Sequence, residues 1–213
     1  MKLSDFIRIV KYGELSTLQR GNDYEAITAF VNMGLLALYV KFPLRSEEFL
    51  IELQDGQSIY DLPEDFMYMT GAYETADEDS DTTVVTLPIN EEGNLYSVNT
   101  VNYRQVQIPL SVSGAYVGII YVARPELLTP DEPTEEDAGI DAEIPLPEQL
   151  IEALINYVAS KAHGGIVVDG QATQAATYYR RFERLCDEYD LRGVGIAADD
   201  LEMPERKFLR GFP

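Results

Sequence analysis

The chain has 213 residues, of which 37 are acidic and 16 are Lys or Arg, so its net charge is −21 at pH 7. This charge argues against a protein that reads or wraps nucleic acid, because such binding depends on Lys and Arg to neutralise phosphates. One cysteine excludes an internal disulfide. The N-terminus lacks a basic region followed by an apolar one, and no stretch approaches the ~20 apolar residues of a membrane span, so we expect neither a signal peptide nor a membrane segment.

Two helices are predicted in the N-terminal part of the chain. The apolar residues from Phe6 to Val10 indicate a short helix that is capped by Ser4 and ends near Gly13. A longer helix runs from a cap at Asn22 to Phe42, because the proline that follows disfavours a helical conformation in the residue before it. Gly34 inside this helix costs about 1 kcal/mol relative to alanine, which indicates close packing against another element.

From residue 46 the apolar residues alternate with polar ones, as is typical of strands. We expect residues 49–53 and 59–62 to form a β-hairpin around the Asp55-Gly56 turn. Further strands are predicted at residues 66–73, 84–87, 103–110 and 116–122. The roughly five or six strands form a small antiparallel sheet or barrel inserted between helical segments.

Residues 144–193 predict a helical hairpin on which the rest of the chain is organised. Its first helix begins near Pro147 and ends at Gly164-Gly165, since glycine adopts the left-handed conformation that helix C-termini often need. Its second helix is capped by Asp169 and ends at about Leu191. The expected inward face of this helix consists of Ala172, Ala175 or Ala176, Tyr179, Phe182, Cys186 and Tyr189. Two amphipathic helices joined by a short link lie antiparallel and share a core.

The predicted fold class is α+β, with a helical bundle, an inserted small antiparallel β-sheet or barrel domain and an extended C-terminal tail. We assign residues 1–44 and 145–193 to the helical bundle and residues 45–125 to the β domain. An acidic linker rich in Pro and Gly covers residues 126–144. The tail covers residues 194–213 and has no periodicity that could build a core.

Residues with catalytic or metal-binding potential form no recognisable motif. The single histidine, His163, lies at a predicted helix C-terminus, where a protonated imidazole favours the helix dipole, and no second His or nearby Cys completes a metal site. Cys186 lies on an apolar stripe and is expected to be a small buried hydrophobe. The acidic clusters at residues 77–79 and 135–137 lie in predicted loops, without the partly desolvated surroundings that separate the pKa values of catalytic carboxylates. We therefore predict no enzyme activity, no metal site and no cofactor.

The end of the tail combines bases and aromatic residues in an otherwise acidic chain. These residues are Arg206, Lys207, Phe208, Arg210 and Phe212. One interpretation is a frayed terminus. The other is a segment that becomes ordered on a partner, with the aromatic side chains as anchors and the bases in contact with acids.

Several short motifs occur in the same order as the predicted elements. They are Asn32–Tyr39, Tyr60–Pro63, Ile144–Leu150, Tyr157–Ala159, Tyr178–Glu183, Lys207-Phe208 and Arg210–Phe212. In these motifs the chain resembles the head-to-tail adaptor (connector) proteins of tailed bacteriophages, in particular the tail tubular protein A type of short-tailed phages. The resemblance covers most of the chain.

This resemblance implies a virion protein of the phage neck, made in the host cytoplasm and assembled as a homo-oligomeric ring, a dodecamer. The ring would lie between the portal protein and the tail nozzle or tail tube protein. DNA would pass through its channel without sequence-specific binding, and an acidic wall would disfavour DNA adhesion. The portal-binding residues would be those of the tail, Arg206, Lys207, Phe208, Arg210 and Phe212. Arg180, Arg181 and Arg184, on the exposed face of the hairpin, are predicted to meet acidic residues of a neighbouring subunit.

A second hypothesis stays open from the sequence. The β domain could make the protein an acidic tail-associated module that binds a receptor or a glycan. Tyr96, Tyr103, Tyr116 and Tyr121 in or near the predicted strands are compatible with this function, although tyrosines in strands more often serve packing.

Overall fold

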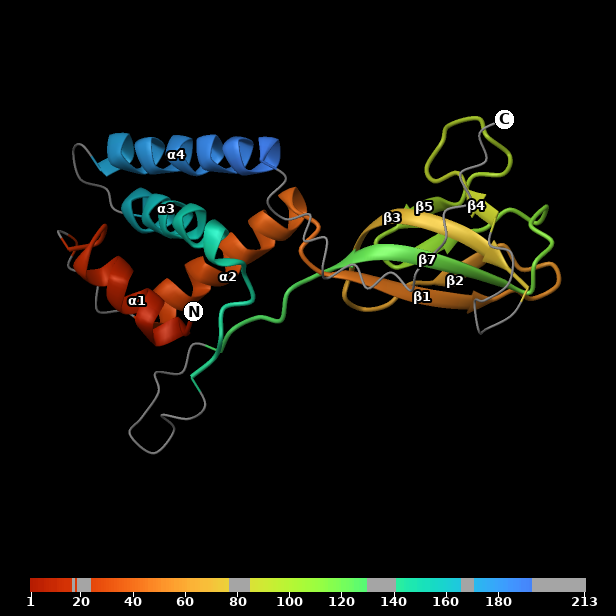
Figure 1. The fold of residues 1–213 in the computed structure, drawn as a ribbon, viewed down its shortest axis with the longest axis horizontal. Helices are drawn as coiled ribbons and strands as arrows, with labels where there is room; N and C mark the ends of the chain where they lie inside the picture. Colours follow the sequence, from red (N-terminus) through yellow and green to blue (C-terminus); the bar gives the residue numbers. More distant parts are fainter. Residues whose placement is uncertain (17, 19–23, 77–84, 130–140, 166–170, 193–213) are drawn as a thin grey trace.

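The computed structural model describes residues 1–16, 18, 24–76, 85–129, 141–165 and 171–192. A helical half and a β half lie next to each other along the long axis of the molecule (Figure 1). The predicted α+β class is confirmed. None of the helices within the described residues has the length and apolar character that a membrane crossing requires.

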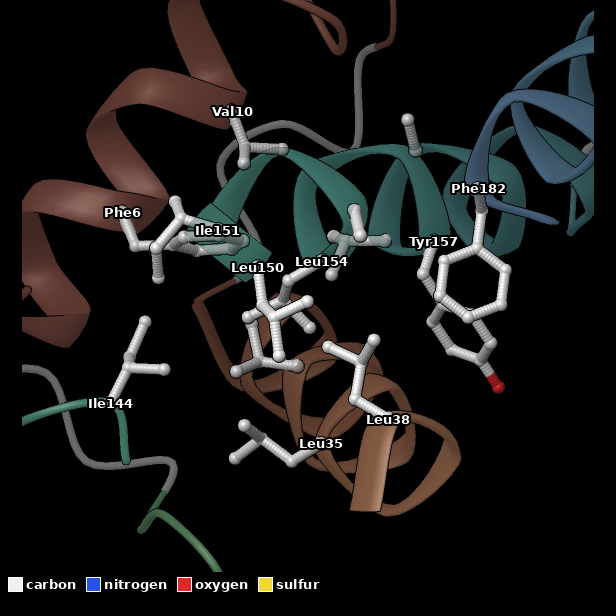
Figure 2. Packing of buried hydrophobic residues seen from close by; sticks show 14 of the residues in the cluster. Phe6, Val10, Leu35, Leu38, Ile144, Leu150, Ile151, Leu154, Tyr157 and Phe182 are labelled. Carbon is white, nitrogen blue, oxygen red and sulfur yellow. The ribbon is translucent and has the colours of Figure 1, made fainter. Parts of the chain in front are cut away.

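Within the described residues, the helical half contains four helices: α1 (Leu3–Tyr12), α2 (Tyr24–Lys41), α3 (Glu148–Gly164) and α4 (Gln171–Leu191). The centre of this half is α3, which packs against α2 on one side and α4 on the other. Figure 2 shows Leu35 and Leu38 of α2 pointing toward Leu150 and Leu154 of α3. The predicted antiparallel hairpin is therefore the element around which the helical core forms.

Gly34 lies where α2 and α3 approach each other most closely. A Cβ atom at this position would lie 2.4 Å from Leu154 Cδ1 and 3.0 Å from Tyr157 Cδ1. A larger residue does not fit at position 34, because two side chains of α3 occupy the space. This confirms the close packing that the sequence predicted at Gly34.

Two predicted helix ends differ from the structure. Lys2 is the N-cap residue of α1 and makes no side-chain capping bond. Ser4 instead lies within the first turn, and its hydroxyl donates a hydrogen bond to the Asp141 carboxylate. At the end of α3, Gly165 has φ −80° and ψ 1°, and its N–H bonds to the Lys161 carbonyl. The Ser4 cap and the left-handed glycine were wrong, because a tertiary partner attracts the serine and a tight turn closes α3.

The predicted inward face of α4 is confirmed in part. Phe182 and Cys186 are buried, Tyr189 packs against the core, and Ala175 is half-buried, whereas Ala172, Ala176 and Tyr179 are exposed. Leu185, which was not predicted to point inward, is buried. Tyr178, the neighbour of Tyr179, packs against the core. Tyr178 is held inward by a hydrogen bond as well as by apolar packing, because its hydroxyl donates to the Glu14 carboxylate.

The β half contains two antiparallel sheets. One has the strand order β1-β7-β3-β4, from β1 (Ser46–Glu52), β7 (Tyr116–Ala123), β3 (Phe66–Thr75) and β4 (Val85–Leu87). The other has the order β2-β6-β5, from β2 (Ile59–Asp61), β6 (Gln105–Gln107) and β5 (Asn99–Asn102). Apolar residues of both sheets form a second core that shares no residue with the helical core.

The predicted β-hairpin of residues 49–53 and 59–62 was wrong. The turn exists, and Gly56 has the left-handed φ of 77° that favours glycine there. The strand before it, however, pairs with β7, and the strand after it pairs with β6. The turn therefore carries the chain from one sheet to the other. β5 was not predicted, and β6 is shorter than the predicted strand at residues 103–110.

The chain leaves the helical half after α2 and returns along the same helix. The side chain of Asn32 forms two hydrogen bonds with the backbone of Leu128, 2.9 Å as donor and 2.8 Å as acceptor. Further along α2, the Tyr39 hydroxyl donates to the Pro145 carbonyl at 3.0 Å. Leu128 near the start of the predicted linker of residues 126–144 and Pro145 directly after it are thus bonded to α2, and residues 130–140 lie outside the described part of the chain. The division into domains stays a prediction.

Candidate interaction surfaces

The described residues offer no chemical site, so the candidate functional features are surfaces. Among them no group of His, Cys, Asp and Glu side chains could hold a metal ion. Cys186 is buried, as predicted, and its burial raises the pKa of the thiol to about 11. A thiol with a pKa that high is a poor nucleophile at neutral pH, because the reactive species is the thiolate.

An exposed apolar surface lies on α2. Between Ala26 and Val40 the helix has no charged residue, so apolar side chains surround its whole circumference. One face packs against α3, and the opposite face exposes a row that we name the α2 stripe. The α2 stripe consists of Ala29, Met33, Leu36 and Val40. Its three larger side chains are between 36% and 61% exposed. A helix that is apolar all round is normally buried on all sides, so the α2 stripe lacks, within the described part of the chain, the partner that its sequence fits.

The polar side chains of α2 do not interrupt this stripe, because they point elsewhere. Thr28 bonds to the carbonyl of Tyr24 one turn earlier at 2.8 Å. Asn32 and Tyr39 bond to the returning chain, at Leu128 and Pro145. The exposed face of α2 therefore presents only apolar side chains between Ala29 and Val40. The spacing of i, i+4, i+7 and i+11 places the four residues of the stripe in one row along the helix.

The outer face of α4 is charged, and its two flanks differ in sign. Arg181, Arg184 and Arg192 lie on one flank, where Arg192 pairs with Glu188 one turn earlier. Glu183, Asp187 and Asp190 lie on the other flank, at the helical spacing of four and three residues. Arg180 lies between the two flanks. The predicted contact residues Arg180, Arg181 and Arg184 are thus all exposed on the same helix, and Arg181 lies over the Tyr178 ring at 5.6 Å.

A buried polar junction joins α3, α4 and the residues after α1. His163 is only 1% exposed, and its ring stacks on Tyr178 with a centroid distance of 5.2 Å. Its Nε2 lies 3.2 Å from the backbone carbonyl of Glu14 and its Nδ1 lies 2.5 Å from Gln171 Oε1. Burial and the hydrogen bond to the Glu14 carboxylate raise the pKa of Tyr178 to about 12. The sequence placed His163 correctly at a helix end but did not predict this junction.

The tyrosines that suggested a receptor- or glycan-binding surface do not form one exposed surface in the β half. Tyr96 and Tyr103 are exposed, whereas Tyr121 is buried and donates a hydrogen bond of 3.1 Å to Asp65. The four tyrosines of the glycan-binding hypothesis therefore do not share a face. The predicted portal-binding residues Arg206, Lys207, Phe208, Arg210 and Phe212 lie outside the described residues.

Comparison with protein families identifies the chain. A family model described as "SU10 adaptor protein" matches residues 1–202. The chain belongs to the SU10 adaptor protein family. The adaptor is therefore a structural protein of a bacteriophage virion and not an enzyme. The match supports the predicted head-to-tail adaptor function, and the narrower resemblance to the tail tubular protein A type stays a prediction.

Comparison with solved structures shows a structural likeness. A solved structure titled "Neck of empty GTA particle computed with C6 symmetry" contains a chain that is 12% identical to the adaptor. The likeness covers 84% of this chain and 88% of that chain, with a TM-score of 0.29. No curated protein matches the adaptor.

Proposed function

We propose that the adaptor assembles into a closed ring of identical subunits between the portal protein and the tail, and that α2 supplies one side of each subunit contact. The observation that carries this proposal is the α2 stripe. Four apolar residues in one row on an otherwise uncharged helix face have no partner within the described part of the chain. A ring provides that partner in every subunit at once.

Ring contacts are heterologous, so each subunit needs two different surfaces that fit each other. α2 and α4 lie on opposite sides of α3, as a head-to-tail contact requires (Figure 1). The exposed row Ala172, Ala176, Tyr179 and Glu183 on α4 has the same spacing as the α2 stripe. Its small alanines leave room for the larger side chains of the stripe, so we expect α2 of one subunit to pack on this row of the next.

Charge contributes to the same contact in this proposal. The exposed Arg180 lies on the outer face of α4 between the alanine row and Arg184, which is on the opposite flank, in a chain with a net charge of −21. Acidic residues are abundant on any neighbouring copy, so these arginines gain partners when subunits meet. Their removal is expected to slow association and to increase its salt dependence more than it lowers the final affinity.

The decisive experiment replaces the stripe by charge. Met33→Glu with Leu36→Glu should abolish the ring, because burying two unpaired carboxylates in an apolar contact is costly. Native mass spectrometry and negative-stain images of the purified protein measure the outcome, and they also test the predicted number of twelve subunits. Ile59→Glu in β2 is the matched control, since Ile59 is 46% exposed and Met33 is 45% exposed. Rings that persist in the double variant would disprove the proposed contact.

The charged part is tested by Arg180→Glu with Arg184→Glu. We expect smaller or less stable rings at low salt and a smaller difference from the unmodified protein at high salt, where charges are screened. Unchanged rings at both salt concentrations would show that these arginines take no part in the contact.

The passage of DNA and the portal contact complete the proposed function. The large excess of acids supports a channel to which DNA does not adhere, because like charges repel. Deletion of residues 203–213 should leave a folded, ring-forming protein that no longer docks on portal rings. Docking with unchanged affinity would remove the tail from the contact.

A further inference from the structure

A second surface lies at the other end of the molecule, in the connection between β4 and β5. We name residues 88–98 the β4–β5 loop; it projects sideways from the β half, across the long axis of the molecule (Figure 1). Its two ends are held together at the base. The Val98 N–H donates to the Pro88 carbonyl at 2.9 Å, and the Asn90 N–H donates to the Val98 carbonyl at 2.9 Å. A loop whose ends meet in this way forms a compact unit of its own.

The interior of the loop is braced by side chains. Ser97 is 1% exposed; its hydroxyl accepts the Glu91 N–H at 2.9 Å and donates to Asn99 Oδ1 at 3.0 Å. Asn94 lies across the tip, where its Oδ1 accepts the Tyr96 N–H at 2.9 Å and its amide donates to Glu91 Oε2 at 2.8 Å. The polar side chains of the loop are therefore used to hold its shape.

Two residues of the loop have a positive φ. Asn90 has φ 49°, an uncommon value for a residue other than glycine, and Gly93 has φ 79°. The Asn90 side chain compensates, because its Oδ1 accepts the Thr100 N–H at 2.8 Å. The energetic cost of this conformation is met when the protein folds, so a partner that binds the loop does not have to order it.

The braced loop presents two large apolar side chains at its tip. Leu95 is 83% exposed and Tyr96 is 60% exposed, and they are neighbours in the chain. Neither belongs to the core of the β half. Single exposed apolar residues are ordinary, but an adjacent Leu-Tyr pair held out on a prepared loop has the composition and rigidity of an interface anchor.

Charge indicates what kind of surface the loop fits. The only charged residues between Val85 and Tyr103 are Glu91 and Glu92, and both are exposed. A pocket that accepts the two apolar side chains would therefore lie beside these carboxylates, and basic residues at its edge would complement them. A second copy of this chain is a poor source of such an edge, since acids outnumber bases by 37 to 16.

We propose that the β4–β5 loop is a preformed docking knob, whose Leu95 and Tyr96 insert into an apolar pocket edged by basic side chains on a different protein of the virion. The knob lies in the β half, whereas the proposed ring contact lies in the helical half. In this proposal the helices contact other copies of the adaptor, and the β4–β5 loop contacts the different virion protein. The proposal goes beyond ring formation and does not depend on it.

The first test places a photo-crosslinking amino acid, p-benzoylphenylalanine, at position 96 or 95 of the adaptor in assembled phage particles. Irradiation should join it to a different virion protein, at a peptide where Lys or Arg borders apolar residues. Position 103 is the control, because Tyr103 is 77% exposed on the neighbouring turn. An adduct with another copy of the adaptor, or no adduct beyond that at position 103, would overturn the proposal.

The second test measures affinity for the crosslinked protein after its purification. Leu95→Ser with Tyr96→Ser should weaken binding by roughly tenfold or more, and Tyr103→Ser should change it by less than about twofold. Ser97→Ala should also weaken binding, because the loop is then less ordered before it binds. Ser97 is buried inside the loop, so this effect would not come from a lost contact with the bound protein. Equal affinity in the Leu95 and Tyr96 double variant would overturn the proposal. Native mass spectrometry of the same variants shows whether the ring is intact, so failure of the knob and failure of the ring are distinguished.

Discussion

The helical half and the β half each build a core, but they leave apolar side chains on the surface in different ways. In the helical half these side chains form a straight row on a regular helix, the α2 stripe. In the β half the exposed neighbours Leu95 and Tyr96 lie on an irregular loop held by its own hydrogen bonds. A regular row fits another helix with the same spacing, whereas a shaped loop fits one particular pocket. The comparison favours contacts between copies in the helical half and contact with a different protein in the β half.

The two halves also differ in how the chain builds them. The helical core joins segments from the two parts of the sequence that flank the β half. The β core comes from a single continuous stretch, from Ile51 to Ala123. Since no residue belongs to both cores, damage to one should leave the other folded. The following predictions test this independence, in order of decreasing expected effect.

The largest effect is expected from Leu154→Ala in the centre of α3. Leu154 is fully buried, and removal of its side chain leaves a cavity that should lower the free energy of unfolding of the helical half by about 2–5 kcal/mol. Amide hydrogen exchange should show faster exchange in α2, α3 and α4, with unchanged protection in β3 and β7. Leu191→Ala is the control, because Leu191 is 88% exposed. Equal loss of protection in both halves would mean that they unfold as one unit.

A smaller effect is expected from Gly34→Val. The added side chain would enter the space of Leu154 and Tyr157, and such overpacking costs about 1–3 kcal/mol. The clash is specific, so combination with Leu154→Ala should recover part of the loss by filling the cavity. Denaturant unfolding of both single variants and the double variant measures the coupling. Strictly additive effects would contradict the close approach of α2 and α3 at this point.

In the β half, Ser97→Ala should cost about 1–2 kcal/mol, because it removes the partner of the Glu91 N–H in the β4–β5 loop. The effect should be local, with faster hydrogen exchange at residues 91–99 and little change in the helices. Ser16→Ala is the control, since Ser16 is exposed and its hydroxyl donates to the carbonyl of Gly13 at 2.8 Å. A loop that exchanges as slowly in the variant would show that Ser97 does not hold it.

Local sequence patterns predicted the parts of the fold that depend on local forces. Helical spacing identified the α3–α4 hairpin and the end of α2, and Gly34 indicated a close approach that the structure confirms. Strand pairing was not predictable from local patterns. The turn at Gly56 forms with its left-handed glycine, but the strand before it pairs with the distant β7 and not with the strand that follows the turn. Ser4 satisfied the capping pattern, yet Asp141 lies far away in the sequence and attracts its hydroxyl.

The candidate surfaces were harder to predict, for a related physical reason. α2 is apolar on all sides, so the sequence gives no contrast between its buried and its exposed face. On α4, Tyr178 and Tyr179 are adjacent and chemically identical, and the partners that hold Tyr178 inward, Glu14 and His163, are distant from it in the sequence. No element or surface was predicted at the β4–β5 loop, because the hydrogen bonds that shape it appear only in the folded chain.

The smallest effect at neutral pH, and the most direct comparison of the halves, concerns two tyrosine–carboxylate pairs. Tyr178 donates to Glu14 in the helical half, and Tyr121 donates to Asp65 in the β half. Burial and the adjacent carboxylate raise the pKa of each hydroxyl from 10.0 to about 12. Between these two values the unfolded chain has lost a proton that the folded chain keeps, so a rise in pH favours unfolding. The stability from each pair is complete below pH 10 and is lost as the pH approaches 12.

Tyr178→Phe should therefore flatten the alkaline loss of stability of the helical half, whereas Tyr121→Phe should leave it unchanged. Urea unfolding between about pH 9 and 12, followed by far-UV circular dichroism, reports mainly on the helices and measures this difference. The two variants are matched controls for each other, because both lose one hydroxyl with the same elevated pKa. If both variants flatten the helical transition equally, the halves are energetically coupled. A partner bound to the β half would then change the stability of the subunit contacts in the helical half. The two surfaces would in that case not act independently.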